Sequence, residues 1–154
     1  MNDLHIRPAG AGDLPEIVAM LADDPLGAAR ESPDDLTPYL KAFDRLADDP
    51  NQYQVVAERD GRVVGTLQLT IIAGISRRGA TRSVIEGVRV HADERGSGLG
   101  TKLLQWAIDE SGRQGCQLVQ LTSDATRTEA RRFYERLGFT ASHVGFKMNL
   151  EGGG

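Results

Sequence analysis

The chain has 154 residues, 40% of them hydrophobic, so it can form one compact domain with a sizeable core but not two domains of ordinary size. Its 18 basic and 22 acidic side chains give a formal net charge of -4 at pH 7, which disfavours binding of nucleic acid or an anionic membrane through a global positive field. One cysteine and three widely separated histidines disfavour an internal disulfide and a metal site.

The first ten residues show no basic segment followed by an apolar one, and no run approaches the roughly 18 apolar residues of a membrane span. We therefore predict a cytoplasmic protein with no metal ion, no nucleic-acid partner and no membrane partner. One domain is expected over residues 1–150, followed by a frayed tail over residues 151–154, which contain three glycines.

The N-terminal third predicts one strand and two helices. Leu4–Pro8 has the composition of a short strand that stops at proline, and Asp13 is placed to cap a helix that ends near Ala22. A break at Asp23–Gly27 precedes a second helix over Pro33–Ala47, where apolar residues recur at helical spacing.

The middle of the chain predicts antiparallel strands. Tyr53–Glu58 and Arg62–Ile72 are β-branched, apolar runs joined by a turn with a central Asp-Gly, which is a strong hairpin signal. After a loop, Arg82–Val90 is a further strand, and the glycine inside it, Gly87, indicates a β-bulge.

The C-terminal part predicts a β-α-β-α-β order. A helix is expected from Gly98 to about Arg113, then a strand over Gln117–Leu121 and a helix over Thr126–Leu137 that ends in a left-handed Gly138. Phe139–Asn149 is expected to return as extended chain. The element order as a whole predicts an α/β (α+β) fold with a mixed sheet.

The segment from Val88 to Lys102 consists of a strand, a glycine-rich turn and the start of a helix, a pattern that is typical of phosphate binding. Glycines allow the backbone to approach a diphosphate, and the first helical turn supplies N–H donors. A P-loop is excluded because Thr101 precedes Lys102, and the spacing of the glycines does not fit a dinucleotide-binding fingerprint. A tight turn that only serves helix packing is the structural alternative.

Two motifs carry a resemblance to a known family. The pattern Arg-x-x-Gly-x-Gly, formed by Arg95, Gly98 and Gly100 after a Val-x-Val strand, resembles the acetyl-CoA-binding motif of the GNAT superfamily of N-acetyltransferases. Residues 130–139, ARRFYERLGF, are similar to that superfamily's later signature Ala-x-x-Phe-Tyr-x-x-x-Gly-Phe. The two motifs stand in the expected order on the expected elements.

The resemblance implies a mainly antiparallel sheet flanked by helices, with a splayed central strand pair that opens a cleft for acetyl-CoA as co-substrate. Val88 and Val90 would hydrogen-bond the pantetheine arm like an added strand, and the backbone N–H groups of residues 95–101 would bind the pyrophosphate. Arg127 stands where many members have a cofactor-binding asparagine, so it is retained only as a contact to a phosphate. The implied cofactor-binding residues are Val88, Val90, Arg95, Gly96, Ser97, Gly98, Leu99, Gly100, Thr101 and Arg127.

The resemblance also implies two catalytic residues. Glu86 would act as the general base, directly or through water, and Tyr134 would protonate the departing thiolate of CoA. A solvated strand carboxylate and a tyrosine packed in the core are the structural alternatives for Glu86 and Tyr134.

The predicted reaction moves the acetyl group to a primary amine of a small molecule by direct attack on the thioester. Arg77, Arg78 and Arg82 lie in and just after the loop before Arg82–Val90, where they would suit an anionic acceptor; a solvated basic loop is the structural alternative. Acetylation of a protein lysine or N-terminal amine is the first alternative, supported by acidic pairs at Asp23–Asp24 and Asp34–Asp35. A non-catalytic acyl-CoA-binding sensor module is an alternative of another class. The resemblance further implies a homodimer.

Overall fold

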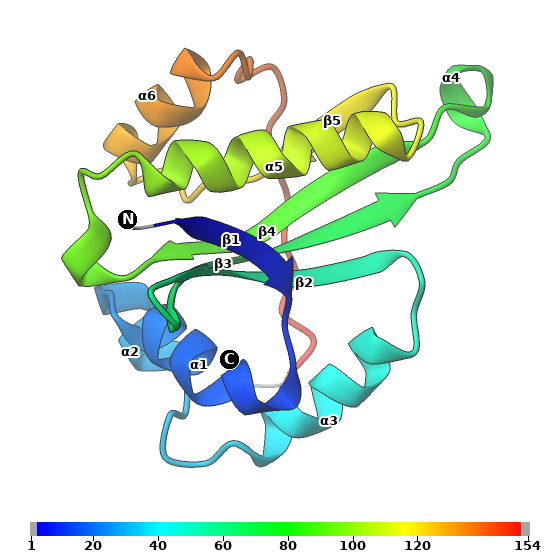
Figure 1. Ribbon diagram of the computed structural model, residues 1–154. Coiled ribbons are helices and arrows are strands. Elements are labelled where there is room, and N and C mark those ends of the chain that lie inside the picture. Colours follow the sequence, from blue (N-terminus) through cyan, green and yellow to red (C-terminus); the bar gives the residue numbers. More distant parts are fainter. Residues whose placement is uncertain (1–2, 152–154) are drawn as a thin grey trace. The chain divides into compact units, whose positions relative to one another are not determined.

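The structure, a computed structural model, describes residues 3–151, which fall into two compact units that divide after Leu121. The first unit contains a sheet with helices on both faces, and the second contains one helix and an extended C-terminal segment (Figure 1). Each unit is described by itself. The single domain expected over residues 1–150 stays a prediction.

The sheet of the first unit has five strands in the order β1-β2-β3-β4-β5. The first four pair antiparallel with their neighbours, and β5 pairs parallel with β4. The predicted mixed, mainly antiparallel sheet is therefore confirmed. The strands are β1 (Leu4–Pro8), β2 (Gln52–Arg59), β3 (Arg62–Ile72), β4 (Arg82–Val90) and β5 (Leu118–Leu121).

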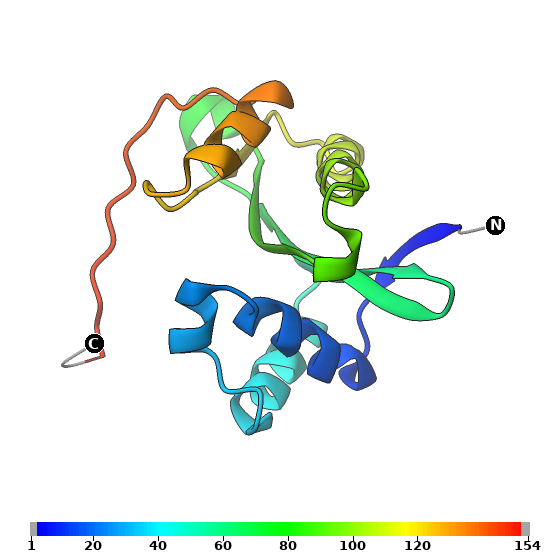
Figure 2. The same ribbon diagram turned by 90° about the vertical axis from the view of Figure 1, so that its left-hand side faces the viewer.

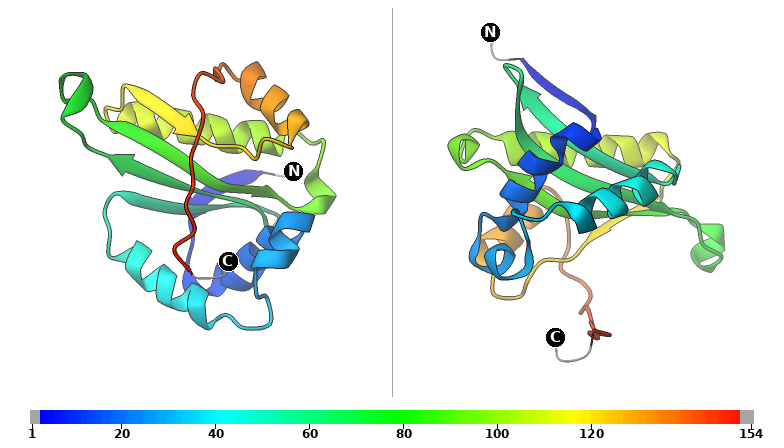
Figure 3. Two further views of the ribbon diagram at one scale, coloured as in Figure 1. Left: turned by 180° about the vertical axis from the view of Figure 1, so that it is seen from behind. Right: turned by 90° about the horizontal axis from the view of Figure 1, so that it is seen from below.

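Helices cover both faces of this sheet. The helices α1, α2 and α3 lie on one face and α5 on the other, so the sheet is enclosed between two helical layers (Figures 2 and 3). Two 3-10 turns, η1 (Ala11–Asp13) and η2 (Ala92–Glu94), precede α1 and α5. The helices are α1 (Leu14–Ala22), α2 (Pro25–Arg30), α3 (Thr37–Ala47), the single turn α4 (Ser76–Gly79) at the β3–β4 connection, and α5 (Leu99–Arg113). Along the described chain, no helix combines the length and apolar character needed to cross a membrane.

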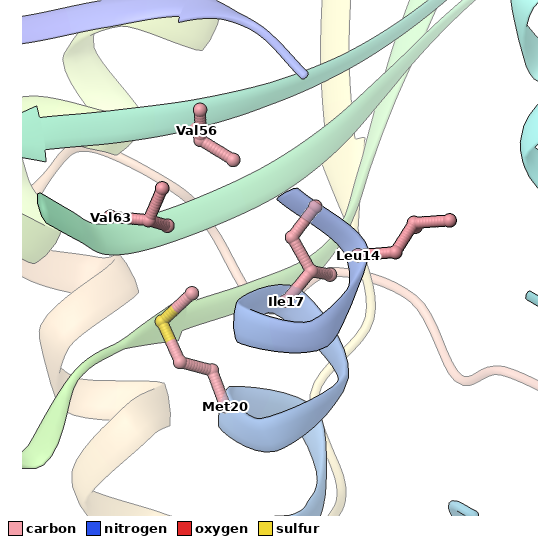
Figure 4. Close-up of a cluster of buried hydrophobic side chains, with 5 residues drawn as sticks. All are labelled: Leu14, Ile17, Met20, Val56 and Val63. Atoms are coloured by element: carbon pink, nitrogen blue, oxygen red, sulfur yellow. The ribbon is translucent and has the colours of Figure 1, made fainter. Parts of the chain in front are cut away.

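Each face of the sheet has its own core. On the α1 face, Leu14, Ile17 and Met20 pack against Val56 and Val63 of the β2–β3 hairpin (Figure 4). On the α5 face the helix lies close to β3, because a Cβ at Gly65 would come within 2.9 Å of Leu103 Cδ1. Glycine at this position therefore permits the close helix–sheet packing.

The predicted turn and bulge are both confirmed. Asp60 and Gly61 have φ values of 54° and 76°, as a two-residue hairpin turn requires. Gly87 has φ 61°, and the β3–β4 register shifts between Thr66 and Gln68, so Gly87 and Val88 together face one residue of β3.

The N-terminal helices differ from the prediction in three ways. Asp13 does not cap α1, because its carboxylate accepts hydrogen bonds from the Gly10 N–H (2.7 Å) and from the guanidinium of Arg7 (2.8 and 3.0 Å). The expected break contains α2, which Asp24 caps by accepting from the Gly27 N–H at 2.6 Å. The next helix begins at Thr37 rather than Pro33.

The second unit contains α6 (Thr128–Arg136), which begins two residues later than predicted. Gly138 has φ 105°, and the Phe139 N–H donates to the Tyr134 carbonyl, which confirms the left-handed helix end. The final β-strand is wrong as a prediction, since residues 139–150 form no strand in this structure. Their apolar residues alternate, but a strand also requires a hydrogen-bonded neighbour, and none of the residues 3–151 supplies one.

Candidate active site

A glycine turn joins β4 to α5. Gly96 and Gly98 have φ values of 82° and 84°, a left-handed conformation that glycine adopts without steric cost, and Gly98 is the residue that precedes the first turn of α5. A Cβ at Gly96 or Gly98 would meet no atom within 4 Å. The turn is therefore open in front of these two residues, as a site that lets a ligand approach the backbone must be.

The predicted N–H donors fall into two groups. The N–H groups of Leu99, Gly100 and Thr101 have no acceptor within the helix, because they lie in its first turn. By contrast, the N–H and hydroxyl of Ser97 both donate to the Glu94 carbonyl, at 3.1 and 2.5 Å, and the Arg95 N–H donates to Ala92. The sequence did not distinguish donors that shape the turn from donors that remain for an anion.

Charged side chains anchor this turn to the β2–β3 hairpin. Arg59 lies 3.3 Å from Glu94, with both side chains 20% exposed, and Arg62 lies 3.3 Å from Asp93. His91 Nδ1 accepts from the Asp93 N–H at 3.1 Å and so caps η2. These contacts hold the backbone of the turn in place before any ligand binds.

The β4–β5 ladder ends early. It runs from the pair Arg82–Leu118 to the pair Ile85–Leu121, so within this unit Glu86 and the later residues of β4 have no partner strand on that side. Val88 and Val90 therefore lie on an unpaired strand edge that leads into the glycine turn. An unpaired edge is what an extended amide chain needs in order to add as a further strand.

Glu86 is the first residue beyond the end of that ladder. Its side chain is exposed and, among the described residues, forms no hydrogen bond or ion pair. In the β3–β4 register it lies opposite Gln68. A carboxylate at this point is free to accept a proton from a bound molecule.

Two adjacent aspartates connect the α1–α2 turn to the candidate site. Asp24 lies 3.4 Å from Arg89 Nε, with the side chains 16% and 20% exposed, and Asp23 lies 3.5 Å from Arg95, with both side chains more than half exposed. Neither pair was predicted from the sequence. The acidic pair was visible, but its partners lie more than 60 positions later in the chain.

Tyr134 and Arg127 belong to the second unit. The Tyr134 ring lies 5.4 Å from the ring of Phe133 and 6.2 Å edge-on from that of Phe139, so aromatic packing fixes its side chain. Arg127 occupies the cap position of α6, and the preceding turn is closed by Asp124, which accepts from the Thr126 N–H at 2.9 Å.

A row of polar side chains on β2 and β3 was not recognised from the sequence. Gln52 Oε1 accepts from Gln68 Nε2 and from the Thr70 hydroxyl, both at 2.9 Å, and Gln54 Nε2 donates to Thr66 at 3.0 Å. The spacing of two between Gln52 and Gln54, and between Gln68 and Thr70, was the available signal. No group of three or more metal-ligating side chains is present among residues 3–151.

Comparison with known proteins shows which family the chain resembles in sequence and fold. The profile of the acetyltransferase (GNAT) family matches residues 14–139. An aminoalkylphosphonate N-acetyltransferase of Salmonella typhimurium is 35% identical over 102 residues, which are 66% of this chain and 66% of that protein. An L-methionine sulfoximine/L-methionine sulfone acetyltransferase of Pseudomonas aeruginosa is 31% identical over 142 residues, which are 89% of this chain and 80% of that protein.

Among solved structures, one from Bacillus halodurans C-125 described as a transcriptional regulator superposes with a TM-score of 0.91 and 44% identity, over 96% of this chain and 99% of that one. The fold and the glycine turn thus define an acyltransferase-type domain. The chain belongs to the GNAT family of acetyltransferases, and the predicted family is confirmed.

The family's acetyl donor is acetyl-CoA, and the residues present fit it. The open left-handed glycine turn and the free first-turn N–H groups suit a pyrophosphate, and the unpaired edge of β4 suits the pantetheine amides. The prediction of an acetyl-CoA-dependent acyltransferase is confirmed at the level of the family.

Proposed function

We propose that this chain transfers an acetyl group from acetyl-CoA to the primary amine of a small molecule. The observation that carries the proposal is the open glycine turn at the start of α5, which follows an unpaired edge of β4 that begins at the exposed carboxylate Glu86. Val88, Val90 and the residues of the turn would bind the donor, and Arg127 would contact a phosphate.

Glu86 would prepare the acceptor. An alkyl amine with a pKa near 10.4 is only about 0.04% neutral at pH 7, so a carboxylate that accepts its proton, directly or through one water, raises the fraction that can react. The amine lone pair then attacks the thioester carbonyl carbon and the C–N bond forms. The C–S bond breaks, and the nitrogen, which carries a positive charge after the attack, gives one proton to solvent water. Tyr134 donates a proton to the leaving thiolate.

Three observations support a small acceptor over a protein. The relatives from Salmonella and Pseudomonas are named for small amines that carry a phosphonate, a sulfone or a sulfoximine. In addition, Asp23 and Asp24 are paired with arginines, which weakens the acidic groove that acetylation of a protein lysine or N-terminus would use. The basic residues Arg77, Arg78 and Arg82 fit an anionic acceptor better than a cationic peptide.

A sensor module is the second candidate, because the structure that is 44% identical is described as a transcriptional regulator. A sensor would bind acetyl-CoA without turnover. A homodimer and a cytoplasmic location also remain predictions for this chain.

The test separates donor binding from chemistry. We expect Tyr134→Phe to lower kcat by about 100-fold or more while the calorimetric Kd for acetyl-CoA stays within twofold of wild type. Glu86→Gln should lower kcat and kcat/KM at pH 7. An unchanged kcat in both variants would overturn the assigned roles, and tight acetyl-CoA binding by wild type without turnover of any amine would favour the sensor.

A further inference from the structure

The sheet face that carries Glu86 is polar where α1 does not cover it. Paired residues share a face, so the register places Glu86 with Gln68 and Gln54, and Val84 with Thr70 and Gln52. These residues are half-buried or exposed. Their neighbours on the opposite face, such as Leu67 and Leu69, are fully buried.

The polar side chains are ordered by one another. Gln52 Oε1 accepts two hydrogen bonds at 2.9 Å, one from Gln68 Nε2 and one from the Thr70 hydroxyl. Because these side chains are already fixed, the protein loses less conformational entropy when a ligand binds to them.

This arrangement leaves specific groups for a ligand. With Gln68 Nε2 directed at Gln52, no described residue donates to Gln68 Oε1, which lies one strand from Glu86. With Gln52 Oε1 used twice, no described residue accepts from Gln52 Nε2. The polar side chains thus present an acceptor, Gln68 Oε1, on the strand next to Glu86. They present a donor, Gln52 Nε2, on the following strand, and neighbouring strands are about 4.8 Å apart.

We propose that Gln68 and Gln52, with Thr70, form the acceptor-binding surface and select a small amine that carries an oxygen-rich group such as a phosphonate, sulfonyl or carboxylate. This inference rests on the proposed function. The amine N–H bonds to Gln68 Oε1 and Glu86, and the oxygen-rich group, about 5 Å away, accepts from Gln52 Nε2. A plain alkyl amine makes only the first contact and is a poorer substrate.

The first readout needs no turnover. In the complex with CoA, titration with 2-aminoethylphosphonate should shift the side-chain amide NMR signals of Gln52 and Gln68, each assigned by its loss in Gln52→Leu or Gln68→Leu. Propylamine should shift only the Gln68 signal. Gln105 serves as the internal control, because its amide donates to Asp109 on the exposed side of α5 and should not move.

The second readout uses kinetics. Gln68→Leu should raise KM for 2-aminoethylphosphonate about tenfold, as expected for one lost hydrogen bond, while KM for acetyl-CoA and the far-ultraviolet circular dichroism stay unchanged. Gln105→Leu should leave both KM values unchanged. The more conservative Gln68→Glu covers the case in which the leucine variant misfolds, and its added carboxylate should likewise weaken the anionic acceptor.

The outcomes distinguish this inference from the proposed function. Shifts of the Gln52 and Gln68 signals without thiol release would support the binding surface and contradict the transferase. Turnover with unmoved signals and unchanged KM values would support the transferase and overturn the binding surface. Neither shifts nor turnover with any amine would overturn both.

Discussion

Gly98 is the residue whose backbone conformation the candidate site depends on most directly. Gly98 has a φ of 84° and directly precedes Leu99, Gly100 and Thr101, whose N–H groups remain for an anion. A residue with a Cβ in this conformation costs about 1–2 kcal/mol, and the chain can relieve the cost by rotating the turn away from it.

We expect Gly98→Ala to lower the free energy of unfolding by about 1 kcal/mol and to weaken acetyl-CoA binding about tenfold. Chemical denaturation and calorimetry measure the two effects. Gly12→Ala is the matched control, because Gly12 has no positive φ and a Cβ there meets no atom within 4 Å. Equal acetyl-CoA affinities for the two variants would contradict the role of the left-handed turn.

Asp13 provides a pH-dependent prediction. The hydrogen bonds from Arg7 lower the pKa of its carboxyl below the ordinary 3.8. Since the pKa is lower in the folded protein, the stabilisation is present above pH 3.8 and is lost as the pH falls through the folded value.

Asp13→Asn should therefore reduce the free energy of unfolding by about 1 kcal/mol at pH 7. The effect is this small because Arg7 is partly exposed and solvent screens the ion pair. The difference from wild type should shrink as the pH is lowered below 3.8. Urea denaturation at several pH values tests this, and a difference that stays constant down to pH 2.5 would show that the ion pair is not its cause.

At the scale of elements, the sequence predicted well those features that a few neighbouring residues determine. It did not predict features that depend on pairing between distant segments. The Asp60–Gly61 turn and the Gly87 bulge follow from backbone preferences that a few residues determine. The short helix α2 was missed although Asp24 followed by proline is a helix-start signal, because the aspartate was assigned to a helix break.

Other features depend on which strands become neighbours. The register that places Gln68 beside Glu86 and Gln52 joins segments that the sequence alone does not align. Likewise, residues 139–149 were expected to return as the last strand, but Val144, Phe146 and Met148 are 80%, 93% and 84% exposed among the described residues, and no strand forms there. Predicting a strand requires its neighbour as well as its own pattern.

The link between α2 and β4 can be measured as a coupling energy. We expect the double-mutant cycle of Asp24→Asn and Arg89→Met to give about 1 kcal/mol or more in the free energy of unfolding, because both side chains are at least four-fifths buried. The adjacent pair of Asp23 and Arg95 is the control: with both side chains more than half exposed, its coupling should be close to zero. Equal couplings would contradict a buried link.

At the scale of the whole molecule, the residues of the proposed site are divided unequally between the two units. The family profile extends over residues 14–139, across both units, whereas the glycine turn, the edge of β4 and Glu86 all lie in the first. The first unit thus contains Glu86 and all the residues proposed to bind acetyl-CoA except Arg127, which belongs to the second unit together with Tyr134.

Release of free CoA thiol is the most direct measurement of the central claim, that this chain transfers an acetyl group to a small amine. The purified protein is incubated with acetyl-CoA and a panel of aminophosphonates, amino acids and their sulfones, simple alkyl amines and lysine peptides. We predict release above the rate without acceptor for small amines that carry an oxygen-rich group, and a mass increase of one acetyl group on the amine. Release with lysine peptides alone, or none despite binding of acetyl-CoA, would contradict it.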